Sequence, residues 1–357
     1  MTTADIASAR ADKTTMFGAH PWTGVRRLLE RAPGLEELRA HRLQLLEAKR
    51  RREEGLEIPG DLAEEASSAV RSTLLARAVL ARVREACEGE VLVLKGPEVA
   101  AAYPAPWLRP YIDVDILVRD AQDAERRLRA AGFVGVGRAM DWETLHHVQR
   151  LAAPDSPASV EVHRRPKWFR DGTPPTIDDL LSEAVRSTTG VDGVLAPSPR
   201  FHAVLLAAHA WTERPLGRLG DLVDVSAMLE AGSAEAEAIA ARYGVERIWH
   251  ATLRAIDAVL VDERPIWPTR TWARHLPRVR ERTVLEVHLT RALEPFASLP
   301  PLHAPAGMVR SMRRTVLPDA GEPWSEKLAR SWRAIRSPRA RASGYDESVH
   351  GADGHER

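Results

Sequence analysis

Two aspartates, Asp113 and Asp115, stand one residue apart in the run 111–118, where apolar and acidic residues alternate. A period of two predicts a strand that directs both carboxylates to the same face. Hard divalent cations such as Mg²⁺ take oxygen ligands and complete their shell with water and substrate phosphates. The pair therefore indicates a divalent-cation site, although the solvated face of an edge strand would show the same spacing.

A third acid occurs in a similar setting. In the run 160–163, apolar residues alternate with Glu161 and His163, which places these two side chains on one face of a second predicted strand. Three carboxylates on two adjacent strands form the cluster that two-metal phosphoryl or nucleotidyl transfer requires. Like charges between buried positions repel unless a cation offsets them, so an arginine filling this gap would argue against a metal. An exposed edge strand is the alternative for Glu161 and His163.

Upstream, Lys95 and Gly96 end a short apolar run, and Pro97 follows as the first residue of a predicted helix. A glycine at this point lets backbone N–H groups approach a phosphate, and the helix N-terminus adds a partial positive charge. Lys95 could neutralise a phosphate or could be a solvated turn residue. The chain has no G-x-x-x-x-G-K-[ST] motif, which argues against a kinase or ATPase of the P-loop class.

Two further groups of polar residues are weaker candidates. His146 and His147 are adjacent on a predicted strand and so point to opposite faces, which makes joint ligation of one ion difficult. Arg218, Asp221 and Asp224 share one face of a predicted helix. They fit either an ordinary pattern of acids in a first turn or a contact with nucleotide or acceptor.

The elements that position these residues follow from hydrophobic periodicity. Helical spacing is predicted over 21–52, 62–86, 97–103 and 120–131, and strands over 90–96, 111–118, 133–136, 145–151 and 159–163. Helices are predicted again over 178–187, 199–213, 219–231, 233–243, 245–262 and 268–293. The expected class is α+β, divided into a disordered N-terminus (1–20), N-terminal helices (21–88), an α/β core (89–175), a helical domain (176–336) and a disordered tail (337–357).

Composition restricts the partners. The chain has 357 residues, with 51 Lys and Arg against 50 Asp and Glu, so a net charge of +1 gives no global attraction to nucleic acid or anionic lipid. The single cysteine, Cys87, excludes a disulfide framework and a Cys-rich zinc site and fits a reducing compartment. No apolar run approaches the roughly 20 residues of a membrane span, and the N-terminus lacks a secretory apolar stretch. We expect a cytoplasmic protein.

Taken together, these motifs resemble the bacterial "uncharacterised nucleotidyltransferase" family of the DNA polymerase β-type nucleotidyltransferase superfamily. The resemblance covers about residues 70–300 and is carried by Leu94-Lys95-Gly96, Tyr103-Pro104, Arg109, the run 113–118, Gly132-Phe133, His146-His147 and the run 160–163. It implies a minimal nucleotidyltransferase core, which is a small mixed β-sheet flanked by helices, with an N-terminal helical flank and an all-helical C-terminal domain.

The resemblance also implies roles for single residues. Asp113 and Asp115 match the paired acids of the superfamily and Glu161 matches the third, which together would hold Mg²⁺, or Mn²⁺ in its place, on the triphosphate of an NTP. Gly96 occupies the place of the phosphate-contacting glycine. The more familiar members have Gly-Ser where this chain has Lys95-Gly96, so the serine hydroxyl that would touch a phosphate is missing.

The resulting hypothesis is a Mg²⁺-dependent nucleotidyltransferase that moves a nucleoside monophosphate from an NTP to an unknown small-molecule or peptide acceptor. Asp113, Asp115 and Glu161 are the predicted catalytic and metal residues. Lys95 and Arg109 would offset phosphate charge, and His163 and Asp221 complete the predicted binding set.

Two other classes of protein remain open. One is a non-catalytic nucleotidyltransferase-like binding or adaptor module. The other is a metal-dependent glycosyltransferase with a D-x-D motif, against which the length and the absence of a doubly wound α/β pattern argue. Calorimetry with Mg²⁺ and each NTP separates the enzyme from the binding module.

Overall fold

The computed structural model describes residues 21–136, 149–154, 156, 158–169, 172–229, 233–261, 269–318 and 323–336. The predicted disordered ends, 1–20 and 337–357, lie outside the described residues. The same is true of the pair His146-His147 and of most of the strand predicted over 145–151. Its described part contains the short strand β4 (Leu151–Ala152).

A mixed sheet of seven strands forms the centre of the α/β part, in the order β3-β4-β5-β2-β1-β7-β6. Its strands are β1 (Val91–Val93), β2 (Asp113–Leu117), β3 (Val134–Gly135), β4, β5 (Ser159–His163), β6 (Val185–Arg186) and β7 (Val194–Ala196). β2 pairs with β5 in parallel and with β1 in antiparallel. The two strands predicted to carry the acids are therefore direct neighbours.

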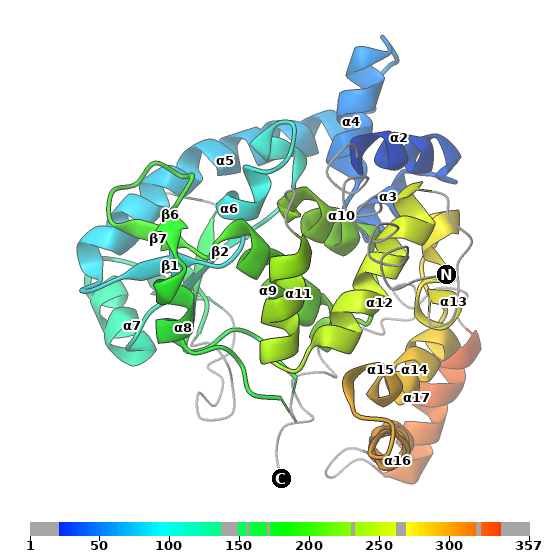
Figure 1. The fold of residues 1–357 in the computed structure, drawn as a ribbon. Coiled ribbons are helices and arrows are strands. Elements are labelled where there is room, and N and C mark those ends of the chain that lie inside the picture. The colour runs from blue at the N-terminus through cyan, green and yellow to red at the C-terminus, as the bar shows by residue number, and fades with distance from the viewer. Residues whose placement is uncertain are drawn as a thin grey trace, which may run out of the picture.

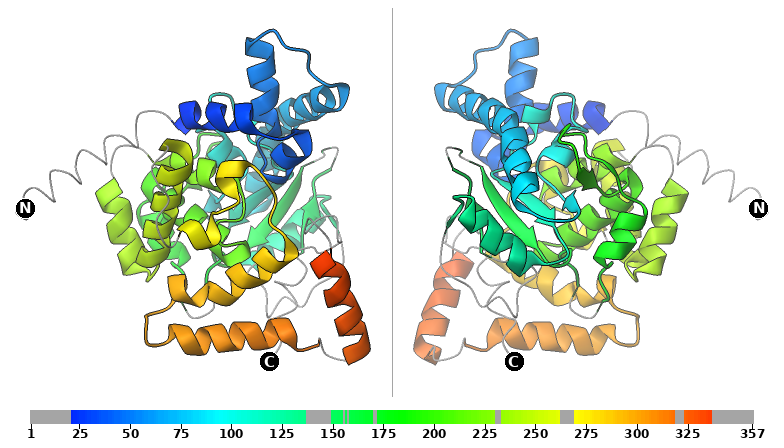
Figure 2. Two further views of the ribbon diagram at one scale, coloured as in Figure 1. Left: turned by 90° about the vertical axis from the view of Figure 1, so that its right-hand side faces the viewer. Right: turned by 90° about the vertical axis from the view of Figure 1, so that its left-hand side faces the viewer.

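The two faces of the sheet are chemically different. Val114 and Ile116 of β2, with Val160 and Val162 of β5, are fully buried on one face, against α5 (Gly60–Ala86) and α7 (Ala121–Ala130). The right-hand view of Figure 2 shows these two helices lying across the sheet. Because side chains alternate along a strand, the acids of β2 and β5 must lie on the opposite face.

The N-terminal helices pack against both the α/β part and the helical part. The helical run predicted over 21–52 is divided into α2 (Pro21–Arg31), α3 (Leu35–Ala40), which begins after Pro33-Gly34, and α4 (Gln44–Glu53), which precedes the long α5. Leu28, Leu38 and Leu43 are buried in the main core, which they share with the helices that follow the sheet. The predicted helical flank is confirmed.

The C-terminal half contains a bundle of helices that contributes most of the main core (Figure 1). They are α8 (Ile177–Ser182), α9 (Pro199–Glu213), α10 (Leu219–Met228), α11 (Ser233–Arg242), α12 (Glu246–Ile256), α13 (Thr269–Trp272), α14 (Val284–Leu293), α15 (Pro295–Ser298), α16 (Ala304–Val316) and α17 (Trp324–Arg336). α6 (Pro97–Ala100) links β1 to β2. The α+β class, with a small mixed sheet and helical flanks, is confirmed.

One predicted helix is too long. The helix predicted over 178–187 ends at Ser182, and β6 and β7 follow as a hairpin that adds to the sheet beside β1. Gly190 and Gly193 both have positive φ, of 69° and 76°, and permit the turn between the two strands. These glycines between short apolar runs are the sequence signal for a hairpin, and the helical prediction overlooked it.

Within the described part of the chain, no helix combines the length and the apolar character that crossing a membrane would need.

Candidate functional site

The parallel pairing of β2 and β5 brings the predicted acids together. In this register Asp115 lies opposite Glu161, Asp113 opposite Ser159, and Leu117 opposite His163. Because the strands are in register and side chains alternate, the two aspartates, Glu161 and His163 share one face. Sequence periodicity predicted the face of each strand, and the structure adds the register that joins them.

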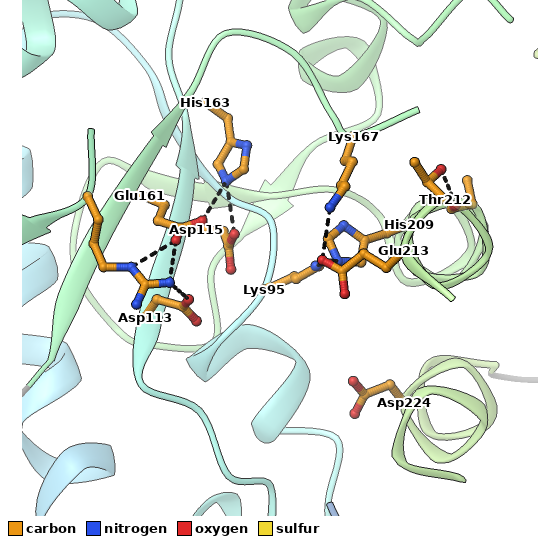
Figure 3. A network of polar contacts seen from close by, with 12 residues as sticks. Lys95, Asp113, Asp115, Glu161, His163, Lys167, His209, Thr212, Glu213 and Asp224 are labelled. Carbon is orange, nitrogen blue, oxygen red and sulfur yellow. Dashed lines mark hydrogen bonds and ion pairs between the residues drawn. The ribbon is translucent and has the colours of Figure 1, made fainter. Parts of the chain in front are cut away.

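Figure 3 shows the resulting cluster on the face that looks toward the helical part. Asp115, Glu161 and His163 each offer a ligand atom, and these three atoms lie within 4.8 Å of one another. His163 Nε2 is 2.9 Å from Asp115 Oδ1 and 3.9 Å from Glu161 Oε2. The side chains of Asp115 and His163 are almost fully buried, while that of Glu161 retains 14% of its exposure.

An arginine that the sequence analysis missed lies between two of the acids. Arg150 Nη2 donates to Asp113 Oδ2 at 3.1 Å and to Glu161 Oε1 at 2.6 Å, and Arg150 Nε donates to the same Glu161 oxygen at 2.9 Å. Arg150 directly precedes β4, the neighbour of β5, so the sheet order places it beside Glu161. Its side chain is 37% exposed, which leaves it room to move away from the acids.

One guanidinium does not neutralise three carboxylates. Burial, together with repulsion from Asp115 and Glu161, raises the pKa of Asp113 to about 6 in spite of Arg150. Burial would also raise the pKa of Asp115, but the hydrogen bond from His163 and the charge of Lys95 hold it well below its ordinary value. The cluster keeps an excess of negative charge.

The donor set fits a hard divalent cation. Asp113, Asp115 and Glu161 supply carboxylate oxygens on adjacent strands, and Mg²⁺ is bound by such oxygens together with water and phosphate. His163 Nε2 orients the Asp115 carboxylate by hydrogen bonding at 2.9 Å, as residues around metal ligands do.

Gly96 lies in the turn between β1 and α6 and packs against the backbone of β2. It precedes α6, has φ +64°, and a Cβ built on it would lie 2.9 Å from the backbone oxygen of Asp113. A glycine is therefore required both by the left-handed backbone and by the close approach to the strand that carries Asp113 and Asp115. Leu94 N donates to Asp115 O at 2.8 Å, so the β1 end and the acidic strand are held together.

Lys95 projects away from Gly96 into a second polar network (Figure 3). Its Nζ contacts His209 Nε2, and that nitrogen lies 3.1 Å from Glu213 Oε1. Lys167 Nζ donates to the same Glu213 oxygen at 3.0 Å. His209 and Glu213 are one turn apart on α9, a spacing that puts them side by side. No motif in the sequence connects Lys95 with His209 or Glu213.

Burial changes the pKa values of Lys95 and His209 in this network. Burial lowers the pKa of Lys95, while Asp115 and Glu213 act in the opposite direction. Burial and the charge of Lys95 lower the pKa of His209 to about 4, so its imidazole is neutral at pH 7. Lys95 thus stands between the acidic cluster and α9.

Arg109, predicted to offset phosphate charge, is directed elsewhere. Its Nε and Nη2 each donate to one carboxylate oxygen of Asp224 at 2.7 Å, and Tyr103 Oη donates to Asp224 Oδ1 at 2.7 Å. Arg109 Nη1 points to the carbonyl of Gly96 at 3.4 Å. Two of its three nitrogens are therefore used within the protein, and the third supports the turn at Gly96.

Asp221, the remaining predicted binding residue, lies in the first turn of α10 and is half-buried. Its negative charge acts on the Arg218 guanidinium and on the Tyr103 hydroxyl. The structure thus places Asp221 with the Arg109–Asp224 pair and Arg218, and joins Asp113, Asp115, Glu161 and His163 in a separate cluster with Lys95 between the two.

Comparison with known families gives one match. The model of the family described as "Uncharacterised nucleotidyltransferase" matches residues 34–260, which span β1 to β7 and most of the helical part that faces the acids. No curated protein and no solved structure matches the chain.

Proposed function

We propose that this chain, which belongs to the uncharacterised nucleotidyltransferase family, is a divalent-metal-dependent enzyme that transfers a nucleoside monophosphate from an NTP to a small-molecule or peptide acceptor. In this reaction an acceptor oxygen forms a bond to the α-phosphorus, the bond from that phosphorus to the bridging oxygen breaks, and pyrophosphate leaves. The proton of the acceptor hydroxyl passes to a base.

The observation that carries the proposal is the convergence of three carboxylates. Asp113, Asp115 and Glu161 would hold the ions, of which Mg²⁺ is the first candidate and Mn²⁺ the second. When bound, such ions neutralise phosphate charge and activate the attacking and leaving oxygens. Three carboxylates brought together on one sheet face repel one another, and a divalent cation would offset the repulsion that remains after Arg150 has paired with Asp113 and Glu161.

The other residues have supporting roles in the proposal. His163 holds the Asp115 carboxylate in place through its 2.9 Å contact. Gly96 lets the backbone approach the triphosphate at the start of α6, and Lys95 lies where its ammonium can shift from His209 toward a phosphate. Arg109 does not touch the nucleotide in this proposal. It positions the Gly96 turn through the contact of its Nη1 with the Gly96 carbonyl.

The second candidate function, a non-catalytic binding module, is favoured by one observation. Arg150 already pairs with Asp113 and Glu161, and a permanent ion pair at this position would occupy Asp113 Oδ2 and Glu161 Oε1 and offset the negative charge that attracts a cation. The two functions therefore differ in a measurable property, which is metal-dependent nucleotide binding.

The test combines calorimetry with a pyrophosphate-release assay. Wild type is titrated with each NTP in the presence and absence of Mg²⁺ or Mn²⁺, and pyrophosphate release is measured across candidate acceptors. We expect metal-dependent binding that Asp113→Asn and Asp115→Asn abolish with the far-UV circular dichroism unchanged. Asp178→Asn is the matched control, because Asp178 is a 72% exposed carboxylate whose ion pair is with Arg119, away from the acidic cluster.

Two outcomes would contradict the proposal. If wild type binds no nucleotide in a metal-dependent manner, the chain is a binding module. If the Asp113 and Asp115 variants retain metal-dependent binding, the metal assignment is wrong. A small-molecule or peptide acceptor and a cytoplasmic location belong to the same proposal and are supported by the near-zero net charge and the lone cysteine.

A further inference from the structure

Arg218 is a charged side chain without a counter-ion. It stands at the N-cap of α10, is half-buried, and has no hydrogen-bond or ion-pair partner among the described residues. Four charged side chains act electrostatically on the Arg218 guanidinium. Arg42 and Arg214 repel it, whereas Asp221 and Glu213 attract it without forming an ion pair. A guanidinium removed from water and left unpaired is unfavourable, so this position is suited to an anionic ligand.

The backbone holds the arginines together in spite of their repulsion. Gly220 N donates to His41 O at 2.9 Å, and a Cβ built on Gly220 would lie 3.1 Å from the Cβ of Arg42. Arg42 itself has φ +60°, a left-handed conformation that is strained for a residue with a side chain. The fold therefore forces Arg42 against the start of α10, next to Arg218.

The turn that connects α9 to α10 brings the third arginine close. Gly217 N donates to Arg214 O at 2.8 Å, and a Cβ on Gly217 would lie 2.6 Å from that of Arg214. The carbonyls of this turn are not available to Arg218, because Arg282 Nη2 donates to Pro215 O and, at 2.9 Å, to Leu216 O. The protein thus supplies positive charge here and directs its own acceptors to another residue.

The arginines are connected to the acidic cluster by a series of charged and polar side chains. Arg218 interacts electrostatically with Glu213, which contacts His209 and Lys167, and His209 contacts Lys95, which interacts electrostatically with Asp115. Figure 3 shows the part of this series from the acids to α9. The side chains of Lys167, His209 and Glu213 are 21–36% exposed, so a ligand can reach them.

We propose that Arg218, together with Arg42 and Lys167, binds a phosphate group of a substrate whose other end lies at the Asp113–Asp115–Glu161 cluster. Arginine recognises phosphate through its planar fork of donors, and lysine adds a point charge. The phosphate is either the distal part of the NTP triphosphate or a phosphate carried by the acceptor. Assignment to a substrate rests on the proposed function, whereas anion binding at Arg218 does not.

The first experiment uses inorganic phosphate and pyrophosphate as probes on the full chain. Because a ligand that binds only the folded state stabilises it, these anions should raise the Tm of wild type by about 2 °C or more at saturation. Arg218→Gln should lose this shift, and Arg218→Lys should keep part of it. Arg126→Gln is the matched control, because Arg126 is a 75% exposed arginine on α7 that pairs with Asp123 of the same helix.

Several outcomes would overturn the inference. They are the absence of any shift in wild type at an ionic strength matched with chloride, or an equal shift in Arg218→Gln. If Arg218→Gln does not fold, as judged by circular dichroism, Arg42→Gln decides instead: Arg42 is exposed, and its variant must show at least a tenfold weaker affinity for pyrophosphate, since a charge-assisted hydrogen bond has about this effect.

A second experiment separates the two sources of the phosphate. If Arg218 binds the triphosphate, Arg218→Gln weakens binding of metal–ATP about tenfold or more, leaves adenosine binding unchanged, and phosphate competes with ATP. If Arg218 binds an acceptor phosphate, the affinity for ATP is unchanged and phosphate binds to the ATP complex as well as to the free protein. Either result supports an anion site at Arg218.

The acidic variants distinguish this inference from the proposed function. Asp113→Asn should keep the phosphate-induced Tm shift, because Asp113 is not among the charges that act on Arg218. A wild-type protein that binds phosphate but shows no metal-dependent nucleotide binding would refute the enzyme and leave the anion site intact. Nucleotidyl transfer with no effect of Arg218→Gln on phosphate binding would refute the anion site alone.

Discussion

Arg109 and Asp224 lie 115 residues apart in the chain and form two hydrogen bonds of 2.7 Å, one from Arg109 Nε and one from Nη2. Both side chains are more than nine-tenths buried. The pair connects the loop before β2 with α10, and Arg109 Nη1 lies 3.4 Å from the carbonyl of Gly96. It therefore fixes the helical part relative to the turn beside the acidic cluster.

Arg109→Met is expected to destabilise the protein by about 3–5 kcal/mol, because it leaves the Asp224 carboxylate buried without its counter-ion. The double variant Arg109→Met/Asp224→Leu should be less destabilised than Arg109→Met, since no charge is then left unpaired. Denaturant unfolding of the variants and wild type measures both effects. A stable Arg109→Met that loses nucleotide binding would instead show that Arg109 contacts phosphate.

Gly96→Ala is expected to abolish metal-dependent nucleotide binding. The left-handed backbone at Gly96 costs alanine about 1 kcal/mol, and the added Cβ would meet the backbone oxygen of Asp113 at 2.9 Å, which displaces the strand that carries the acids. Gly89→Ala is the matched control: Gly89 has φ +76°, but no atom lies within 4 Å of its Cβ position. Equal effects of the two substitutions on binding would contradict the positioning role of Gly96.

Arg150→Gln should increase the dependence of stability on the metal. Arg150 offsets the repulsion among Asp113, Asp115 and Glu161, so its removal lowers the Tm in a metal-free buffer. The vacated carboxylates are then available to the cation, and titration with Mg²⁺ or Mn²⁺ should raise the Tm of Arg150→Gln by more than that of wild type.

The control for this prediction is Arg126→Gln, whose metal response should equal that of wild type. If Arg150→Gln responds to metal no more than wild type does, Arg150 does not compete with a cation. If neither protein responds to metal, the acids are a structural ion-pair cluster.

Acid should destabilise the protein through His41. Burial, together with the charges of Arg218 and Arg282, lowers the pKa of His41 to about 4 in spite of its hydrogen bond to the Arg280 carbonyl. Its Nδ1 accepts from Leu219 N at 3.3 Å, which only the neutral ring can do while Nε2 donates to Arg280 O at 3.0 Å. Below about pH 6.5 the unfolded chain binds a proton at His41 that the folded chain does not. Stability contributed by the neutral ring is therefore present above pH 6.5 and falls as the pH drops toward 4, by about 2 kcal/mol at pH 5.

Denaturant unfolding at pH 7 and pH 5 measures this loss, and His41→Gln should show a correspondingly smaller difference between the two pH values. His250→Gln is the control, because His250 is 35% exposed and pairs with Glu237 on the surface. An equal acid loss in wild type and His41→Gln would contradict the assignment. His202 is also buried with a pKa lowered to about 4, so the loss in His41→Gln is reduced rather than abolished.

The sequence determined the features that depend on local geometry. Alternation with a period of two decided that Asp113 and Asp115 share a face of one strand and that Glu161 and His163 share a face of another. Helical periodicity located α9 within its observed bounds, and the glycine after a short strand marked the turn at Gly96. These properties are set by bonds and contacts within a few residues, so they are visible without knowledge of the rest of the chain.

Tertiary structure decided which residues meet across the fold. The parallel register of β2 and β5 brings Asp115 opposite Glu161, and the sheet order then places Arg150 between the acids. The partners of Arg109 and Lys95 come from helices more than 100 residues away. Alternation sets the face of a strand but not its neighbour, and charge complementarity alone admits many partners, so only the packing of distant segments selects one.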